Sequence, residues 1–212
     1  MADDHTHVQE FFTPRAAGWE TRFPDDDPLY AAAVDDLGLR PGDAVLDAGC
    51  GTGRALPFLR NAVGQDGTVL GADLTPAMLD EAVRAGRDRA ARLLVADVAQ
   101  LPVATGALDA VFAAGLIAHL PRPAENLREL ARAVRPGGLL ALFHPIGRAA
   151  LAARQGRTLT ADDLRAEPNL RPLLADSGWR MTSYVDEDHR FLALAVNQDD
   201  GAGLTRRRSP GA

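Results

Sequence analysis

Short apolar runs alternate along the chain with longer stretches in which apolar residues recur at helical spacing. Such alternation is typical of α/β domains, in which helices connect the strands of a parallel sheet. The first predicted strand starts at Val45, and the later ones cover residues 68–73, 92–96, 108–113 and 138–144. The predicted helices cover residues 27–39, 54–63, 76–87 and 124–134, and Pro136-Gly137-Gly138 marks the end of the last one.

The pattern weakens after residue 144 but still predicts a helix and two strands. Thr160-Ala-Asp-Asp163 has the form of a capping box that opens a helix, and Gly178 would close that helix. Residues 179–185 and 190–196 are predicted strands, joined by the acidic turn 186–188. We therefore expect a hairpin near the end of the chain.

The most informative segment is residues 45–53, Val-Leu-Asp-Ala-Gly-Cys-Gly-Thr-Gly. Gly49, Gly51 and Gly53 alternate with other residues, which strips side chains from a turn and lets the backbone approach a ligand closely. An apolar strand that leads through such a turn into a helix is typical of the nucleotide-binding half of a doubly wound α/β fold.

The spacing of these glycines and the acid before them indicate which nucleotide is bound. A dinucleotide site spaces its glycines G-x-G-x-x-G and places a pyrophosphate at the next helix, where Asp47 would repel it. Here the spacing is G-x-G-x-G. A carboxylate suits a phosphate-free, cationic cofactor, and S-adenosylmethionine (SAM) carries both an ammonium and a sulfonium group.

Two further acids follow predicted strands. Asp73 ends a strand about twenty residues after the glycine turn, from where a carboxylate can accept both ribose hydroxyls. Asp97 follows the next strand and could accept a hydrogen bond from the adenine amino group, with the backbone of Val98 serving the ring. Both acids could instead be helix caps. For Asp73 that role is better filled by Thr75.

With these motifs the chain resembles the class I SAM-dependent methyltransferases, in particular the small-molecule branch with the ubiquinone and menaquinone methyltransferases (methyltransferase type 11). The motifs that carry the resemblance are VLDAGCGTG, GADLTPAML, VADVAQLP, LDAVFAAGLIAHL and LARAVRPGGLLAL. The resemblance implies a single-domain, Rossmann-like doubly wound α/β sheet of about seven strands, mostly parallel with the last strand antiparallel, and helices on both faces. It also implies a helical cap over residues 1–40, a SAM-binding core over 41–197 and a disordered tail over 198–212.

The same resemblance implies SAM as methyl donor, S-adenosylhomocysteine (SAH) as product, and a set of cofactor contacts. The cofactor residues are expected to be Asp47, Gly49, Gly51, Gly53, Asp73, Leu74, Asp97 and Val98.

Contacts to the methyl acceptor are expected after the fourth and fifth strands and in the N-terminal cap, because ligands collect at the carboxyl ends of parallel strands. His144 could act as a general base, or it could hydrogen-bond the backbone beside Pro145. His119 lies where similar enzymes often carry histidine, as a catalytic residue or as part of the pocket wall. The remaining acceptor candidates are Arg148, Trp19 and Tyr30, with Phe11 and Phe12 as pocket residues or as packing anchors.

Composition narrows the choice of partner. The net charge is -6, the chain has no lysine, and its one compact basic run is Arg206-Arg207-Arg208, so nucleic acid is not the expected partner. The single cysteine, Cys50, permits no intramolecular disulfide, and no metal is expected. With no apolar run long enough to span a membrane and a polar start, a cytoplasmic location is expected.

The acceptor is thus expected to be a small organic molecule methylated at O, N or C, and a homodimer is left open. Two alternatives remain: a SAM-binding protein without catalysis, and an NAD(P)-dependent oxidoreductase. The second would have to place a pyrophosphate beside Asp47.

Overall fold

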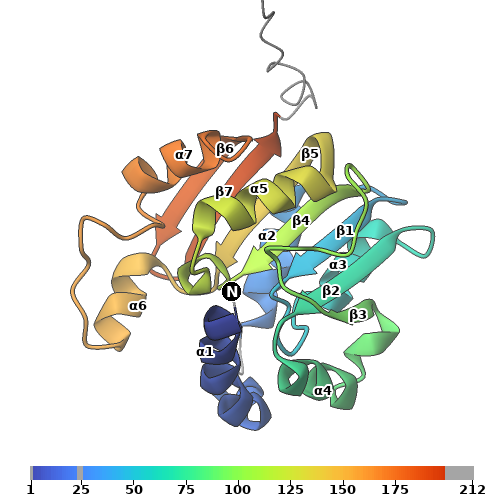
Figure 1. The fold of residues 1–212 in the computed structure, drawn as a ribbon, viewed down its shortest axis with the longest axis horizontal. Coiled ribbons are helices and arrows are strands. Elements are labelled where there is room, and N and C mark those ends of the chain that lie inside the picture. The colour runs from blue at the N-terminus through green and yellow to red at the C-terminus, as the bar shows by residue number, and fades with distance from the viewer. Residues whose placement is uncertain (1, 23–25, 199–212) are drawn as a thin grey trace, which may run out of the picture.

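The computed structural model describes residues 2–22 and 26–198, which form one seven-stranded sheet with helices on both faces (Figure 1). The strand order is β3-β2-β1-β4-β5-β7-β6. In this sheet β7 is antiparallel to both of its neighbours, and the other described pairs are parallel. The strands are β1 (Ala44–Ala48), β2 (Thr68–Asp73), β3 (Arg92–Val95), β4 (Leu108–Ala114), β5 (Val134–His144), β6 (Trp179–Glu187) and β7 (Arg190–Asn197). The predicted fold class is confirmed.

Each face of the sheet is covered by helices whose apolar sides form a separate part of the core (Figure 1). Val34 of α2 and Leu59 of α3 pack on one face, and Leu130 of α5 and Leu174 of α7 pack on the other. The α-helices are α1 (Ala2–Phe12), α2 (Asp27–Leu37), α3 (Leu56–Val63), α4 (Pro76–Arg84), α5 (Pro123–Ala133), α6 (Arg148–Arg154) and α7 (Glu167–Ala175).

Two predicted boundaries near the end of the chain are wrong. The helix expected from Thr160 begins at Glu167, because Ala166 is extended and the side chain of Asp163 accepts a hydrogen bond from the backbone of Arg165 in a turn. The predicted turn at 186–188 is shorter, because Asp186 and Glu187 continue β6 and pair with β7. Helix α6 was not predicted.

The N-terminal region begins with α1 and continues through two short 3-10 helices, η1 (Thr13–Gly18) and η2 (Glu20–Arg22). The tail predicted to be disordered lies outside the described residues, apart from Gln198. Within the described ranges, none of the helices has the length and apolar character needed to cross a membrane.

Candidate active site

A cavity of about 400 Å³ lies where the carboxyl ends of β1, β2, β4 and β5 meet the N-terminal helix. The sheet reverses its order of connection between β1 and β4, and α/β sheets bind their ligands at such a point. Of the predicted cofactor residues, those in contact with this cavity are Asp47, Gly49, Gly51, Asp73, Leu74, Asp97 and Val98.

The glycine turn has left-handed backbone at all three glycines, with φ of 67° at Gly49, 53° at Gly51 and 79° at Gly53. A Cβ atom on Gly51 would meet no described atom within 4 Å, so the backbone is bare on that side. Gly53, in contrast, does not line the cavity, and a Cβ atom there would lie 2.7 Å from Cδ1 of Leu56. Its role as a cofactor contact is not supported, because it provides room for helix packing instead.

The carboxyl group of Asp47 is buried at the floor of the cavity. It is 2% exposed, and its Oδ1 atom has no hydrogen-bond partner among the described residues. Burial, together with the nearby charge of Asp73, raises its pKa to about 8. A buried carboxylate without a partner is costly, so this site favours a ligand that brings a cation or a hydrogen-bond donor.

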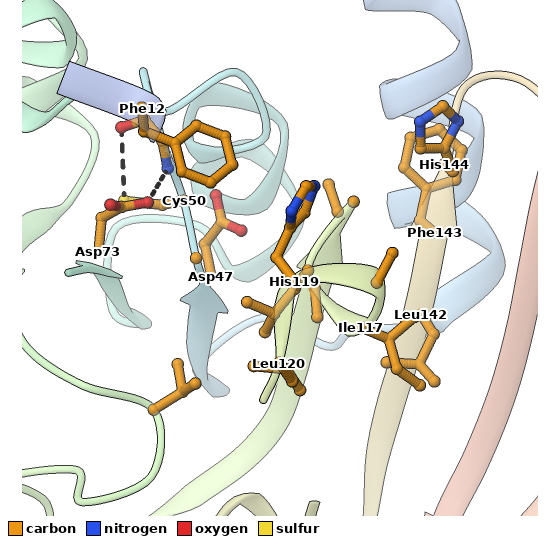
Figure 2. A pocket seen from close by; sticks show the side chains of 18 of the residues that line it. Phe12, Asp47, Cys50, Asp73, Ile117, His119, Leu120, Leu142, Phe143 and His144 are labelled. Carbon is orange, nitrogen blue, oxygen red and sulfur yellow. Dashed lines mark hydrogen bonds between the residues drawn. The ribbon is translucent and has the colours of Figure 1, made fainter. Parts of the chain in front are cut away.

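Asp73 fastens the glycine turn to the second strand. Its Oδ2 atom accepts a hydrogen bond of 2.8 Å from the backbone N–H of Gly51 (Figure 2). Its Oδ1 atom accepts one of 2.8 Å from the backbone N–H of Thr75. Burial raises its pKa, although these backbone donors act in the opposite direction. Asp97 lines the cavity and also accepts a hydrogen bond from the backbone N–H of Ala99. That bond closes a turn, and because no helix begins there the helix-cap alternative for Asp97 is wrong.

Aromatic side chains from the N-terminal segment close the cavity from above the sheet. The ring of Phe12 lies 5.1 Å from that of His119 and 5.6 Å from that of Trp19, measured between centroids. Helix α1 is tied to the cofactor side by the side-chain amide of Gln9, which donates to the backbone oxygen of Leu74 at 2.9 Å. Phe11, Phe12, Trp19 and Tyr30 therefore all line the cavity.

An ionic connection that no sequence motif predicts joins this segment to the glycine turn. Glu20 accepts hydrogen bonds from both guanidinium ends of Arg87 and from the hydroxyl of Thr52. Arg87 also donates to the backbone oxygen of Thr52 at 2.8 Å, and the buried Arg54 lies 3.8 Å from Glu20. No motif reveals these contacts, since Glu20 and Arg87 are 67 residues apart.

His144 lines the cavity but is poorly suited to act as a general base. Its Nδ1 atom lies 3.0 Å from the backbone N and 2.8 Å from the backbone O of Ile146, which is the backbone interaction considered as the alternative. Burial, with the charges of Arg165 and His119 nearby, lowers its pKa to about 4. The imidazole is therefore neutral at pH 7 and a weak base, and Nε2 remains for a ligand.

His119 is at the end of a 3-10 turn, η4 (Ile117–His119), and its ring packs against that of Phe12. Burial and the charge of Arg165 lower its pKa as well. Tyr30 packs with its ring centroid 5.1 Å from that of Phe143, and burial raises the pKa of its hydroxyl. Both residues thus stand as neutral side chains in the wall.

Of the two arginines in this region, the structure places Arg165 at the cavity and not the predicted Arg148. The guanidinium of Arg148 is held by Asp186, with Nε 2.9 Å from Oδ2, and by Asp163 at 3.6 Å. Arg148 is therefore not placed where an acceptor could reach it. Arg165 lies in the polar stretch before α7, where the sequence gives no signal of function.

The comparisons with known proteins agree with this geometry. Residues 46–142 match the family described as methyltransferase domain. The chain is 36% identical to 27-O-demethylrifamycin SV methyltransferase of Amycolatopsis mediterranei over 110 residues, covering 50% of this chain and 40% of the relative. It is 27% identical to demethylmenaquinone methyltransferase of Beutenbergia cavernae, covering 77% of this chain and 76% of the relative.

Among solved structures, magnesium protoporphyrin IX methyltransferase from Synechocystis with bound SAH shares the fold, with a TM-score of 0.68 at 20% identity. The match covers 91% of this chain and 99% of that one. The chain spans less than half the length of several curated relatives that it matches. Residues 46–142 thus match a methyltransferase domain, and the chain shares its fold with SAM-dependent methyltransferases.

Proposed function

We propose that this chain binds SAM in the described cavity and transfers its methyl group to a small organic acceptor at O, N or C. The observation that carries the proposal is the unpartnered Oδ1 atom of Asp47, buried beside a glycine turn with a bare backbone at Gly51. A cation against this carboxyl group stabilises its ionised form and compensates its burial, whereas the charge of a pyrophosphate would be unfavourable beside it.

The other cofactor contacts follow from the placement of the acids. Asp73 would accept the ribose hydroxyls, and Asp97 with the backbone of Val98 would hold the adenine ring at the next strand. Leu74, next to Asp73 in the chain, also lines the cavity wall. These residues fit an amino acid joined to a nucleoside without phosphate.

When bound, SAM supplies an electrophilic methyl group on a sulfonium with a neutral leaving group. The chain has to hold the acceptor in line with that methyl group and exclude water, and well-oriented reactants gain much of their rate from position alone. Phe12 and Trp19 exclude water from above, and the neutral imidazoles of His119 and His144 form part of the acceptor wall. The weak basicity of His144 favours positioning over proton abstraction.

Calorimetry with SAH tests the cofactor assignment. We expect wild-type protein to bind SAH, and Asp47→Asn to weaken that binding about tenfold or more, because a charge-assisted hydrogen bond is lost. Asp80→Asn, an exposed residue on α4, serves as the matched control and should bind SAH as the wild type does. Binding of NADH without binding of SAH would overturn the assignment.

Mass spectrometry tests the transfer itself. Wild-type protein is incubated with SAM and a panel of small alcohols, phenols, amines and carboxylic acids, and methylated products are sought. Formation of such a product, lost in Asp47→Asn, supports catalysis. Firm SAH binding with no product from any acceptor class would favour the alternative of a SAM-binding protein without catalysis.

A further inference from the structure

Charged groups are not evenly distributed around the cavity. The carboxyl groups of Asp47 and Asp73 lie on the side of β1 and β2, and the imidazoles of His119 and His144 lie on the side of β4 and β5 (Figure 2). Arg165 lines the cavity on the histidine side, since its positive charge acts on both imidazoles. One end of the cavity therefore holds the two carboxyl groups, with the nearby Arg54 paired to Asp26 and Asp27, and the other end holds the guanidinium of Arg165.

Arg165 is held in place by its backbone. Its N–H donates to Oδ1 of Asp163 at 2.8 Å, and its carbonyl oxygen accepts a hydrogen bond of 2.8 Å from the hydroxyl of Tyr184. The side chain is 11% exposed, and its guanidinium carbon lies 6.0 Å from the ring centroid of Phe191. The guanidinium is thus positioned by the fold and largely removed from water.

The charge of this guanidinium is only weakly compensated. Among the described residues its ion-pair partner is Asp163, with Nε 3.6 Å from Oδ1, which is beyond hydrogen-bond distance. Asp163 is shared with Arg148, whose own closer partner is Asp186 at 2.9 Å. A guanidinium that is buried to this extent normally has good hydrogen-bond acceptors, since its planar donors are costly to leave unpaired.

We propose that the methyl acceptor carries an anionic group, a carboxylate or a phosphate, that binds to Arg165, while its apolar body lies among the side chains lining the rest of the cavity. The inference rests on the proposed function and specifies its substrate class. The body of the acceptor would face Ile117, Leu151 and the rings of Phe11 and Phe12. A neutral acceptor that filled this cavity would displace water from Arg165 and leave its donors unpaired.

Matched pairs of probes test the proposal by calorimetry on protein saturated with SAH. The pairs are 4-hydroxybenzoate with 4-hydroxybenzamide, dodecanoate with dodecanol, and phenyl phosphate with phenol. We expect the anion of at least one pair to bind about tenfold or more tightly than its neutral partner, which is the effect of a charge-assisted contact. The first two pairs test for binding of a carboxylate, and the third pair tests for binding of a phosphate.

Variants show whether Arg165 carries this preference. Arg165→Gln should abolish it, and Arg165→Lys should retain part of it, because lysine keeps the charge but not the planar pair of donors. Arg171→Gln, an exposed arginine on α7 that pairs with Glu167, is the matched control. If Arg165 served only to pair with Asp163, then Asp163→Asn would reduce anion binding as much as Arg165→Gln does. The proposal instead expects anion binding to persist in Asp163→Asn.

SAH affinity is measured in every variant and separates the two proposals. Failure of wild-type protein to bind SAH would count against the proposed function. Three results, each with normal SAH binding, would overturn this inference alone. They are equal affinity for charged and neutral probes, binding of no probe at millimolar concentration, and an unchanged preference for anions in Arg165→Gln.

Discussion

At the scale of single residues, the carboxyl group of Asp47 has a pKa far from that of an ordinary aspartate. The group is buried beneath the glycine turn beside a second acid, and its pKa rises to about 8. In the unfolded chain the same group titrates near 3.8. The folded, ligand-free protein therefore holds a proton at Asp47 that the unfolded chain releases between these two pKa values.

This difference predicts how stability depends on pH. Between about pH 4 and pH 8 the folded state binds more protons than the unfolded state, so the contribution of Asp47 to the free energy of unfolding falls as pH rises. Asp47→Asn removes this loss, which amounts to at most about 1.4 kcal/mol per pH unit. In urea unfolding of ligand-free protein, the free energy of unfolding of the variant relative to the wild type should be higher at pH 8 than at pH 5. A constant difference at both values would contradict the raised pKa.

At the scale of elements, the N-terminal segment is coupled to the glycine turn through Glu20. Burial raises the pKa of Glu20, but its hydrogen bonds with Arg87 and Thr52 outweigh that effect and lower it, so the group is ionised at neutral pH. The aromatic lid of Phe12 and Trp19 lies just before this contact in the chain. We infer that Glu20 holds the lid over the cofactor end of the cavity.

Replacing Glu20 tests this role. Glu20→Gln should loosen the lid, because a neutral amide cannot form charge-assisted bonds with Arg87, and SAH affinity should fall roughly tenfold. Amide hydrogen exchange should quicken in residues 8–19 while α5 stays protected. Glu81→Gln, which breaks a pair with the exposed Arg84 on α4, is the control. Unchanged exchange in residues 8–19 would show that other contacts hold the segment.

At the scale of the whole molecule, the last hairpin completes the sheet and places one end of the cavity. β7 inserts antiparallel between β5 and β6, and Phe191 of β7 and Arg165 both line the cavity. Trp179 attaches the hairpin to α5. It is fully buried and donates its indole N–H to the backbone oxygen of Leu127 at 2.9 Å. Asn197 adds hydrogen bonds to the end of α5 and the start of β5.

Removing this anchor should destabilise the molecule without altering the cofactor contacts. Trp179→Ala leaves a cavity in the core and removes this hydrogen bond, and the free energy of unfolding should fall by about 3–5 kcal/mol. Urea unfolding followed by the fluorescence of Trp19 measures this loss. SAH affinity of the folded variant, measured well below the unfolding midpoint, should stay within about twofold of wild type, and a large decrease would show that the hairpin also shapes the cofactor end.

The sequence by itself determined the fold class and the positions of the acids and glycines around the turn after β1. These features are local: a strand, a turn and a helix follow one another within a few residues, so spacing alone places Asp47, Gly51 and Asp73. The tertiary structure decided the rest. Arg165 took the place expected of Arg148, because side-chain position in a loop depends on packing against distant strands, and the weak basicity of His144 follows from burial and neighbouring charges, which no local pattern encodes.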